Sequence, residues 1–229
     1  MSHAARDLQT IEGRLQVSPE SGVSWILLEP PAATALYVCG HGAGANMRHA
    51  TMTAIATELA RRGVAVFRFN FPFLESAKRP VDARPVATAV VAAAVAQARA
   101  LRPALPLFIG GHSFGGRMAS HAMVEHDLGD VRGLVFCSFP LHPPEKPGIS
   151  RAAHLGAIER PMLFLSGTRD ALATPDLLRG VVAGLGERAT LVWLDTADHS
   201  YKVLKRTRVR SDGVFEELAD AAVTWMERR

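Results

Sequence analysis

Short apolar runs alternate with longer segments of helical periodicity, and this alternation constrains the fold of the chain more than any other feature. The strand-like runs lie at residues 23–30, 34–40, 64–70, 105–111, 131–140, 160–170 and 188–199, and the helix-like segments at 49–63, 86–101, 114–126 and 212–229. Strands that are joined through helices usually pair in parallel. We therefore expect an α/β fold with a doubly wound, mostly parallel sheet of about eight strands and helices on both faces.

The length of the chain predicts one α/β domain spanning residues 1–229. Hydrophobic residues make up 48% of the chain and charged residues 21%, which is typical of a folded domain and not of a disordered segment. The segment between Ser138 and Arg160 holds about twenty residues. This is enough for a loop or one short helix, so we expect no large lid.

Composition argues against several classes of protein. The longest apolar segments are Ala-rich and too short to span a bilayer, and the N-terminus has no apolar stretch typical of a secretory signal. Cys39 and Cys137 lie inside apolar runs, which predicts buried free thiols in a reducing compartment. We therefore expect a cytoplasmic protein with no membrane partner. The sequence leaves the oligomeric state open.

The net charge is +4, and the densest basic run extends from Lys202 to Arg210. A basic run can bind an anion or a nucleic acid. No aromatic residues are interleaved with this one for base stacking, and no nucleic-acid motif accompanies it. We interpret it as a solvated surface segment and expect no nucleic-acid partner.

The stretch Gly111–Gly115 reads G-H-S-F-G and lies where a predicted strand turns into a predicted helix. A G-x-S-x-G sequence in this context is typical of a nucleophile elbow, in which a strained turn exposes the serine at the carboxyl edge of the sheet. We expect the two glycines to be required because a Cβ atom there would strike a neighbouring strand or helix. Ser113 is therefore the candidate nucleophile.

A serine nucleophile needs a histidine base and an acid that orients it, and in this elbow context they follow in the order serine, acid, histidine. Asp170 ends the run at 160–170 and is expected in the loop that its strand leads into, and His199 is the only histidine after it. Asp195 and Asp198 are alternative acids. His112 lies in the elbow, where we expect it to pack.

The segment His41–Gly44 follows a predicted strand and resembles the HG-type oxyanion loop of folds that carry such an elbow. We expect the backbone N–H groups of Ala43 and Phe114 to bind the oxyanion, with Gly42 next to the substrate. The same glycines also match a dinucleotide-binding pattern. That interpretation requires an acid at the end of the next strand, and residues 64–70 end without one, although Arg68 could hold a 2′-phosphate.

Apolar residues follow two of the predicted strands and leave two interpretations open. Phe71, Phe139 and Leu141, together with Phe73 and Leu74, could line an apolar substrate pocket, or they could be core residues beneath the loops. The cations at Lys78, Arg79 and Arg84 could attract an anionic substrate, although solvated loop charges are the simpler explanation.

Six segments together resemble the α/β-hydrolase superfamily. They read GHGAGANMRH, FRFNFPFLE, GGHSFGGRMAS, FPLHPPEKP, LSGTRDAL and DHSYKVLKR, in order over roughly residues 34–210. They are similar to a small lidless group that includes dienelactone-hydrolase-like proteins, the testis-expressed protein thirty family and the third subunit of the non-specific-lethal chromatin complex. The resemblance implies an eight-stranded hydrolase core with Ser113, Asp170 and His199 at the triad positions. Dienelactone hydrolases themselves carry a cysteine where this chain has Ser113.

These observations predict a serine hydrolase that acts on a small-molecule ester or thioester through a Ser-His-Asp acyl-enzyme mechanism. Such a mechanism requires no metal and no organic cofactor. The alternative is a non-catalytic interaction protein with a hydrolase fold. A scaffold has no chemical reason to keep the three residue types at three strand ends, so the enzyme is the main hypothesis.

Overall fold

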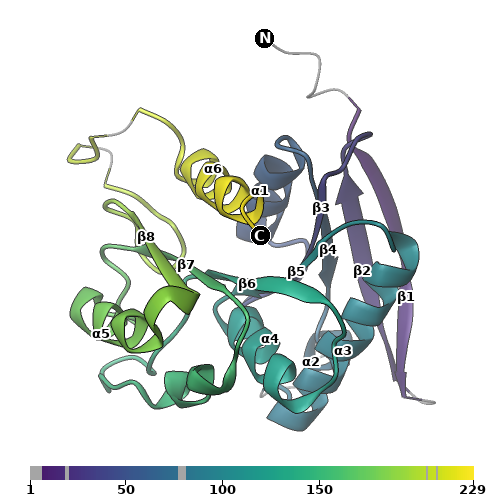
Figure 1. The fold of residues 1–229 in the computed structure, drawn as a ribbon, viewed down its shortest axis with the longest axis horizontal. Helices are drawn as coiled ribbons and strands as arrows, with labels where there is room; N and C mark the ends of the chain where they lie inside the picture. Colours follow the sequence, from purple (N-terminus) through teal and green to yellow (C-terminus); the bar gives the residue numbers. More distant parts are fainter. Residues whose placement is uncertain (1–6, 19–20, 77–80, 205, 210) are drawn as a thin grey trace.

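One eight-stranded sheet organises the chain, in the order β1-β2-β4-β3-β5-β6-β7-β8 (Figure 1). The computed structural model describes residues 7–18, 21–76, 81–204, 206–209 and 211–229. The strands are β1 (Gln9–Ser18), β2 (Ser21–Glu29), β3 (Ala35–Gly40), β4 (Val64–Phe69), β5 (Leu107–His112), β6 (Val131–Cys137), β7 (Met162–Gly167) and β8 (Ala189–Leu194). β1, β2 and β4 pair antiparallel, and all pairs from β4 to β8 are parallel. The predicted fold class is confirmed.

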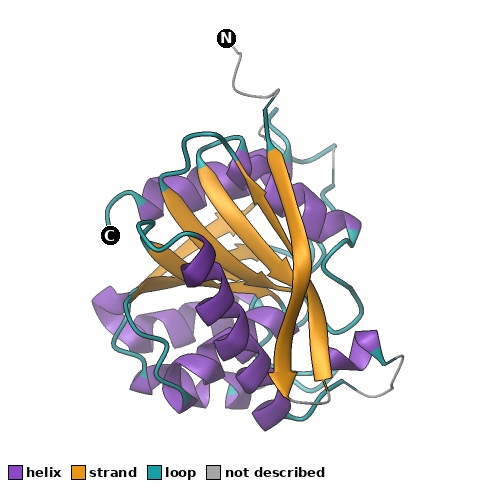
Figure 2. Cartoon of the chain, turned by 90° about the vertical axis from the view of Figure 1, so that its right-hand side faces the viewer, coloured by secondary structure: helices purple, strands orange, loops and turns teal. Residues whose placement is uncertain are grey.

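Helices cover both faces of the sheet. They are α1 (Ala50–Ala60), α2 (Pro72–Glu75), α3 (Arg84–Leu101), α4 (Phe114–Glu125), α5 (Pro175–Leu185) and α6 (Val214–Met226), with the 3₁₀ turns η1 (Ser150–Ala157) and η2 (Gly186–Arg188). Buried residues of α1 and α6 belong to one apolar cluster, and those of α3, α4 and α5 belong to the other. Figure 2 shows the two helical layers on either side of the twisted sheet.

The central strands are apolar throughout because both of their faces are covered. Every residue of β3, β4, β5 and β7 is buried. Strands of this kind read as continuous apolar runs, whereas a strand with one solvated face alternates. β1 is the strand that our sequence analysis missed, because Leu15 is the only buried residue among those of β1 whose burial is described, and the apolar content of the strand is low.

The segment between β6 and β7 contains the short η1 turn and no larger insertion. The carboxyl edge of the sheet is therefore not covered by a lid from this segment, as the sequence predicted. Within the described residues, no helix combines the length and the apolar character needed to cross a membrane.

The basic run is not uniformly solvated. The side chain of Arg208 is only 5% exposed, and its guanidinium donates to the Asp195 carbonyl oxygen at 2.7 Å and contacts the Glu217 carboxylate. Our interpretation of the whole run as solvated surface was wrong at this residue, because an acid on α6 offers Arg208 a buried partner. Lys205 and Arg210 lie outside the described residues.

Candidate active site

Ser113 forms a strained link between β5 and α4. Its backbone has φ 51° and ψ −112°, in the left-handed half of conformational space that residues with a Cβ rarely adopt. A conformation of this kind costs about 1–3 kcal/mol and persists only where the surrounding structure holds it. Here the Ser113 N–H donates to the Cys137 carbonyl oxygen at 3.0 Å. The neighbouring strand β6 thus helps to hold the turn.

The glycines of the elbow allow α4 to lie against the backbone of β3. A Cβ atom on Gly111 or on Gly115 would lie 2.1 Å from the Gly40 carbonyl oxygen, far inside van der Waals contact. Gly111 also has φ +141°. The expectation that these two glycines are required by a neighbouring strand is confirmed.

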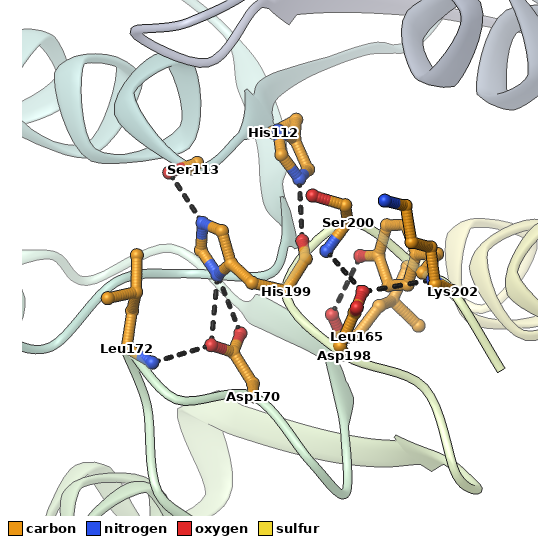
Figure 3. A network of polar contacts seen from close by, with 10 residues as sticks. His112, Ser113, Leu165, Asp170, Leu172, Asp198, His199, Ser200 and Lys202 are labelled. Atoms are coloured by element: carbon orange, nitrogen blue, oxygen red, sulfur yellow. Dashed lines mark hydrogen bonds and ion pairs between the residues drawn. The ribbon is translucent and has the colours of Figure 1, made fainter. Parts of the chain in front are cut away.

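Ser113, His199 and Asp170 form a continuous hydrogen-bonded chain, as Figure 3 shows. Ser113 Oγ lies 2.9 Å from His199 Nε2, and His199 Nδ1 lies 2.9 and 2.8 Å from the two Asp170 carboxylate oxygens. The Asp170 side chain is fully buried, and that of His199 is 20% exposed. With Nδ1–H donating to the carboxylate, Nε2 carries a lone pair that faces the serine hydroxyl.

The alternative acids do not contact the His199 ring. Asp170 also accepts the Leu172 N–H at 2.8 Å, which orients its carboxylate. Asp198 instead accepts the backbone N–H groups of Ser200 and Lys202 at 2.9 Å each and so closes its own loop (Figure 3). Among the three candidate acids, the structure places only Asp170 against the histidine.

His112 does more than pack, which the sequence analysis missed. Its ring donates from Nε2 to the His199 carbonyl oxygen at 2.9 Å, so the residue before the nucleophile holds the loop that carries the histidine (Figure 3). Burial is the main cause that lowers the pKa of His112 to about 4, and the ring is therefore neutral near pH 7. Only the contact between distant segments reveals this role.

His41 holds the glycine loop, His41–Gly44, in place after β3 through two hydrogen bonds. Its Nδ1–H donates to the Gly42 carbonyl oxygen at 2.8 Å, and its Nε2 accepts the Phe71 N–H at 3.1 Å. Burial lowers the pKa of His41 to about 4. Both ring nitrogens are thus engaged in one neutral tautomer, which fixes the glycine loop against the loop after β4.

The predicted oxyanion donors lie on two segments that meet at Ser113. A Cβ atom built on Gly42 would lie 3.6 Å from Ser113 Cβ, so the loop that carries Gly42 and Ala43 passes next to the serine. Phe114 is the first residue of α4, where backbone N–H groups have no intrahelical acceptor. The roles of Ala43 and Phe114 as donors stay a prediction.

The predicted pocket residues Phe71, Phe139 and Leu141 are closed off from solvent. Each is at most 1% exposed and belongs to an apolar core cluster. Of the two interpretations, the structure favours core residues beneath the loops, and the assignment as open pocket walls was wrong. The physical reason is that aromatic rings fill the space under the edge, with Phe71 in edge contact with Phe69 and Phe114.

Two candidate anion-binding residues are engaged by the protein itself. Arg84 pairs with Glu125 at 3.0 Å. Arg68, considered for a 2′-phosphate, is buried and donates to the Met47 carbonyl oxygen at 2.8 Å and to Thr53 Oγ1 at 3.2 Å. Lys78 and Arg79 lie outside the described residues.

Cys39 and Cys137 are buried free thiols, as predicted. Burial raises the pKa of Cys39 to about 12. The part of the chain that the structure describes contains no cluster of three or more His, Cys, Asp or Glu side chains suited to a metal ion.

Acidification is expected to destabilise the protein through His41 and His112. An unfolded histidine takes up its proton near pH 6.5, whereas these two do so near pH 4 in the fold. Between these values the unfolded chain binds more protons, so the free energy of unfolding falls as pH falls through this window, by up to about 3 kcal/mol per residue. Urea unfolding at pH 7 and pH 4.5 measures the effect.

The matched variants are His41→Gln, His112→Gln and, as a control, the exposed His49→Gln. We expect each of the first two to weaken the dependence of stability on pH and the control to retain it. An unchanged pH dependence in both variants would contradict the assignment.

Comparison with known proteins gives the family of this chain. Residues 33–227 match a family model described as an alpha/beta hydrolase domain. A dienelactone hydrolase from Anabaena variabilis ATCC 29413 has a similar structure, with a TM-score of 0.75 and 17% identity, over 96% of this chain and 98% of that chain. A serine hydrolase without a lid from Xanthomonas campestris matches with a TM-score of 0.70 and 19% identity, over 96% and 94% of the two chains.

Est1E from Butyrivibrio proteoclasticus also matches, with a TM-score of 0.72 and 16% identity, over 95% of this chain and 98% of that chain. At sequence identities of 16–19%, the structural likeness to these proteins shows a shared fold and nothing more. The family model covers most of the sequence, and the α/β-hydrolase resemblance is confirmed at that level. The chain belongs to the alpha/beta hydrolase domain family.

Proposed function

We propose that this protein is a serine hydrolase that cleaves a small-molecule ester or thioester through an acyl-enzyme. The observation that carries the proposal is the chain of hydrogen bonds from Ser113 through His199 to Asp170. It brings a hydroxyl, a base and an acid from three distant segments into contact at one edge of the sheet. This is the geometry that an activated serine requires.

Each residue has a distinct role in the proposed reaction. His199 Nε2 takes the Ser113 proton as Oγ attacks the carbonyl carbon, and the N–H groups of Ala43 and Phe114 bind the developing oxyanion. His199 then donates that proton to the leaving alcohol or thiol. Water attacks the acyl-enzyme, with His199 again as the base. Asp170 holds the tautomer of His199 and stabilises its protonated ring.

A small substrate is favoured because η1 and its loops provide no lid over the edge of the sheet. The neighbours of similar fold include the dienelactone hydrolase and Est1E, the latter also solved with ferulic acid bound. They support small acyl compounds as a substrate class. The serine at position 113 argues against a dienelactone, since those hydrolases use a cysteine.

Several finer expectations stay predictions. They are a single domain over residues 1–229, a cytoplasmic location and membership of the testis-expressed protein thirty group. The first follows from the length of the chain, the second from its composition and its two cysteines in apolar runs, and the third from the six motifs over roughly residues 34–210.

Labelling with a fluorophosphonate probe tests the proposal directly, because the probe reacts with an activated serine. We expect the wild-type protein to be labelled and both Ser113→Ala and His199→Ala to lose the label. Circular dichroism of each variant controls for folding. A folded wild-type protein that takes no label would contradict the hydrolase proposal and favour the non-catalytic interaction protein.

A further inference from the structure

Two arginines on the first part of α4 and on η1 carry charges that the protein does not neutralise. Arg117 lies four residues after Ser113, and Arg151 lies in η1. Neither guanidinium has an acidic partner or a hydrogen-bond acceptor among the described residues. Nε of Arg117 is in addition buried without a partner. Buried donors in native proteins are nearly always satisfied by protein, water or a bound group. Arg68 and Arg208 also bury Nε without a partner, but the protein engages their other guanidinium nitrogens, and among the described residues it does not do so for Arg117.

The guanidinium of Arg117 lies towards the end of α4 that carries the nucleophile. Long helical side chains lean towards the N-terminus, over the preceding turn. In agreement, the Arg117 guanidinium carbon lies 5.9 Å from the centre of the Phe114 ring, over the residue that follows Ser113. Four residues of helix span about 6 Å, so a group bound to Arg117 lies close to the serine.

The surroundings of the two arginines are positive overall. Burial and the charge of Arg151 both lower the pKa of Arg117. The acid in this region is Glu125, and it already pairs with Arg84 at 3.0 Å and accepts the Thr88 hydroxyl at 3.1 Å. Among the residues outside the described ranges, Glu20 is the only acidic one, and in the sequence it falls between β1 and β2.

The positive potential contributes to lowered pKa values of two neighbouring histidines. His121 on α4 and His154 on η1 stack with ring centres 3.6 Å apart. Burial, then the charges of nearby groups that include Arg117, lower the pKa of His154 to about 4. Burial and the charge of Arg84 also lower the pKa of His121. His154 therefore remains neutral near pH 7 and adds no positive charge that would compete for an anion. The two histidines tie η1 to α4, since His154 also contacts Ser120 at 2.7 Å.

The Phe114 ring covers one face of the Arg117 guanidinium. The N–H donors point outward in the plane of the guanidinium, so this contact gives them no acceptor. Planar guanidinium groups bind carboxylate and phosphate through two parallel hydrogen bonds. We propose that Arg117 and Arg151 form a subsite for an anionic group of the substrate, a carboxylate or a phosphate. The subsite rests on the proposed hydrolase function and specifies its substrate as an ester that carries a negative charge near the scissile carbonyl.

The test compares p-nitrophenyl esters of matched length that end in a carboxylate, a phosphonate or a neutral methyl ester. A roughly four- to six-carbon acyl chain suits the helical spacing between Ser113 and Arg117. We expect the wild-type kcat/KM to be at least about tenfold higher for an anionic ester than for the neutral one. Each of Arg117→Gln and Arg151→Gln is expected to bring that ratio close to one, mainly through KM. The preferred anion identifies the charged group.

Arg179→Gln is the matched control, because Arg179 also lies over an aromatic ring, at 5.3 Å from the centre of Trp193, but on α5. It is expected to keep the wild-type ratio. A second measurement is independent of turnover: thermal unfolding of the full-length protein with succinate or inorganic phosphate, at constant ionic strength. We expect stabilisation of wild type and of Ser113→Ala, and none of Arg117→Gln.

The two proposals fail in different ways. If the neutral ester is hydrolysed, but the anionic preference is absent or survives in both arginine variants, the subsite is wrong and the hydrolase proposal stands. If no ester is hydrolysed and the fluorophosphonate does not label Ser113, the hydrolase proposal is wrong. In that case thermal unfolding with succinate or phosphate tests the anion site by itself. The proposal of an anion site is overturned if neither anion stabilises the wild type.

Discussion

Replacement of Ser113 by alanine is expected to lower kcat for ester hydrolysis by about 10⁶-fold, because no other hydroxyl lies against His199 Nε2 among the described contacts. The residues of a triad act as one unit, so removal of the nucleophile abolishes the acyl-enzyme route completely. Turnover of p-nitrophenyl acetate, measured beside a wild-type preparation of equal folded content, gives the ratio. A variant that retains more than about 1% of the wild-type kcat would place the nucleophile elsewhere.

Asp170→Asn is expected to lower kcat less than Ser113→Ala does, and this difference separates the role of the acid from that of the nucleophile. An amide at this position can donate to His199 Nδ1 and so favours the tautomer that cannot accept the serine proton. We expect kcat to fall by about 10⁴-fold while the serine remains present. Asp176→Asn is the control, because its side chain is 97% exposed and pairs with Arg179 on the surface. An equal loss in both variants would point to general damage instead of a triad role.

Replacement of Gly115 by alanine is expected to destabilise the protein by more than about 3 kcal/mol or to prevent folding. The added Cβ would lie 2.1 Å from the carbonyl oxygen and 2.2 Å from the carbonyl carbon of Gly40. Both atoms belong to β3, which pairs with β4 on one side and β5 on the other and has no freedom to move away. Urea unfolding followed by circular dichroism measures the loss.

Gly180→Ala is the matched control for Gly115→Ala. Gly180 also lies in a helix, α5, but a Cβ atom there meets nothing within 4 Å. Alanine favours helix over glycine by about 0.8–1 kcal/mol, so the control should be slightly more stable than the wild type. Wild-type stability of Gly115→Ala would show that α4 and β3 do not pack as closely as described.

Local patterns in the sequence predicted the fold class because both faces of the central strands are buried. That burial requires continuous apolar runs such as β3 and β5, and these are visible without any structure. β1 escaped detection because it lies at the edge of the sheet, and Leu15 is the only buried residue among those of β1 whose burial is described. The signal for a strand weakens where the core no longer constrains its residues.

The sequence also identified Ser113, Asp170 and His199 as candidates, because each lies just after a predicted strand and parallel strands end at one edge. It could not separate Asp170 from Asp195 and Asp198 by contact, since the choice depends on where two loops meet. The same is true of His112, whose ring reaches the His199 carbonyl across 87 residues of chain.

The sequence by itself determined the α/β class, the elbow and the three residue types at the strand ends, because these depend on periodicity and on backbone conformation within a few residues. Only the tertiary structure decided which acid faces His199 and that Phe71, Phe139 and Leu141 are core. It also decided that Arg68 and Arg84 have protein partners, whereas Arg117 and Arg151 have no side-chain partner among the described residues. Burial and charge pairing are properties of contacts between distant segments, and a side chain has neither until the chain has folded.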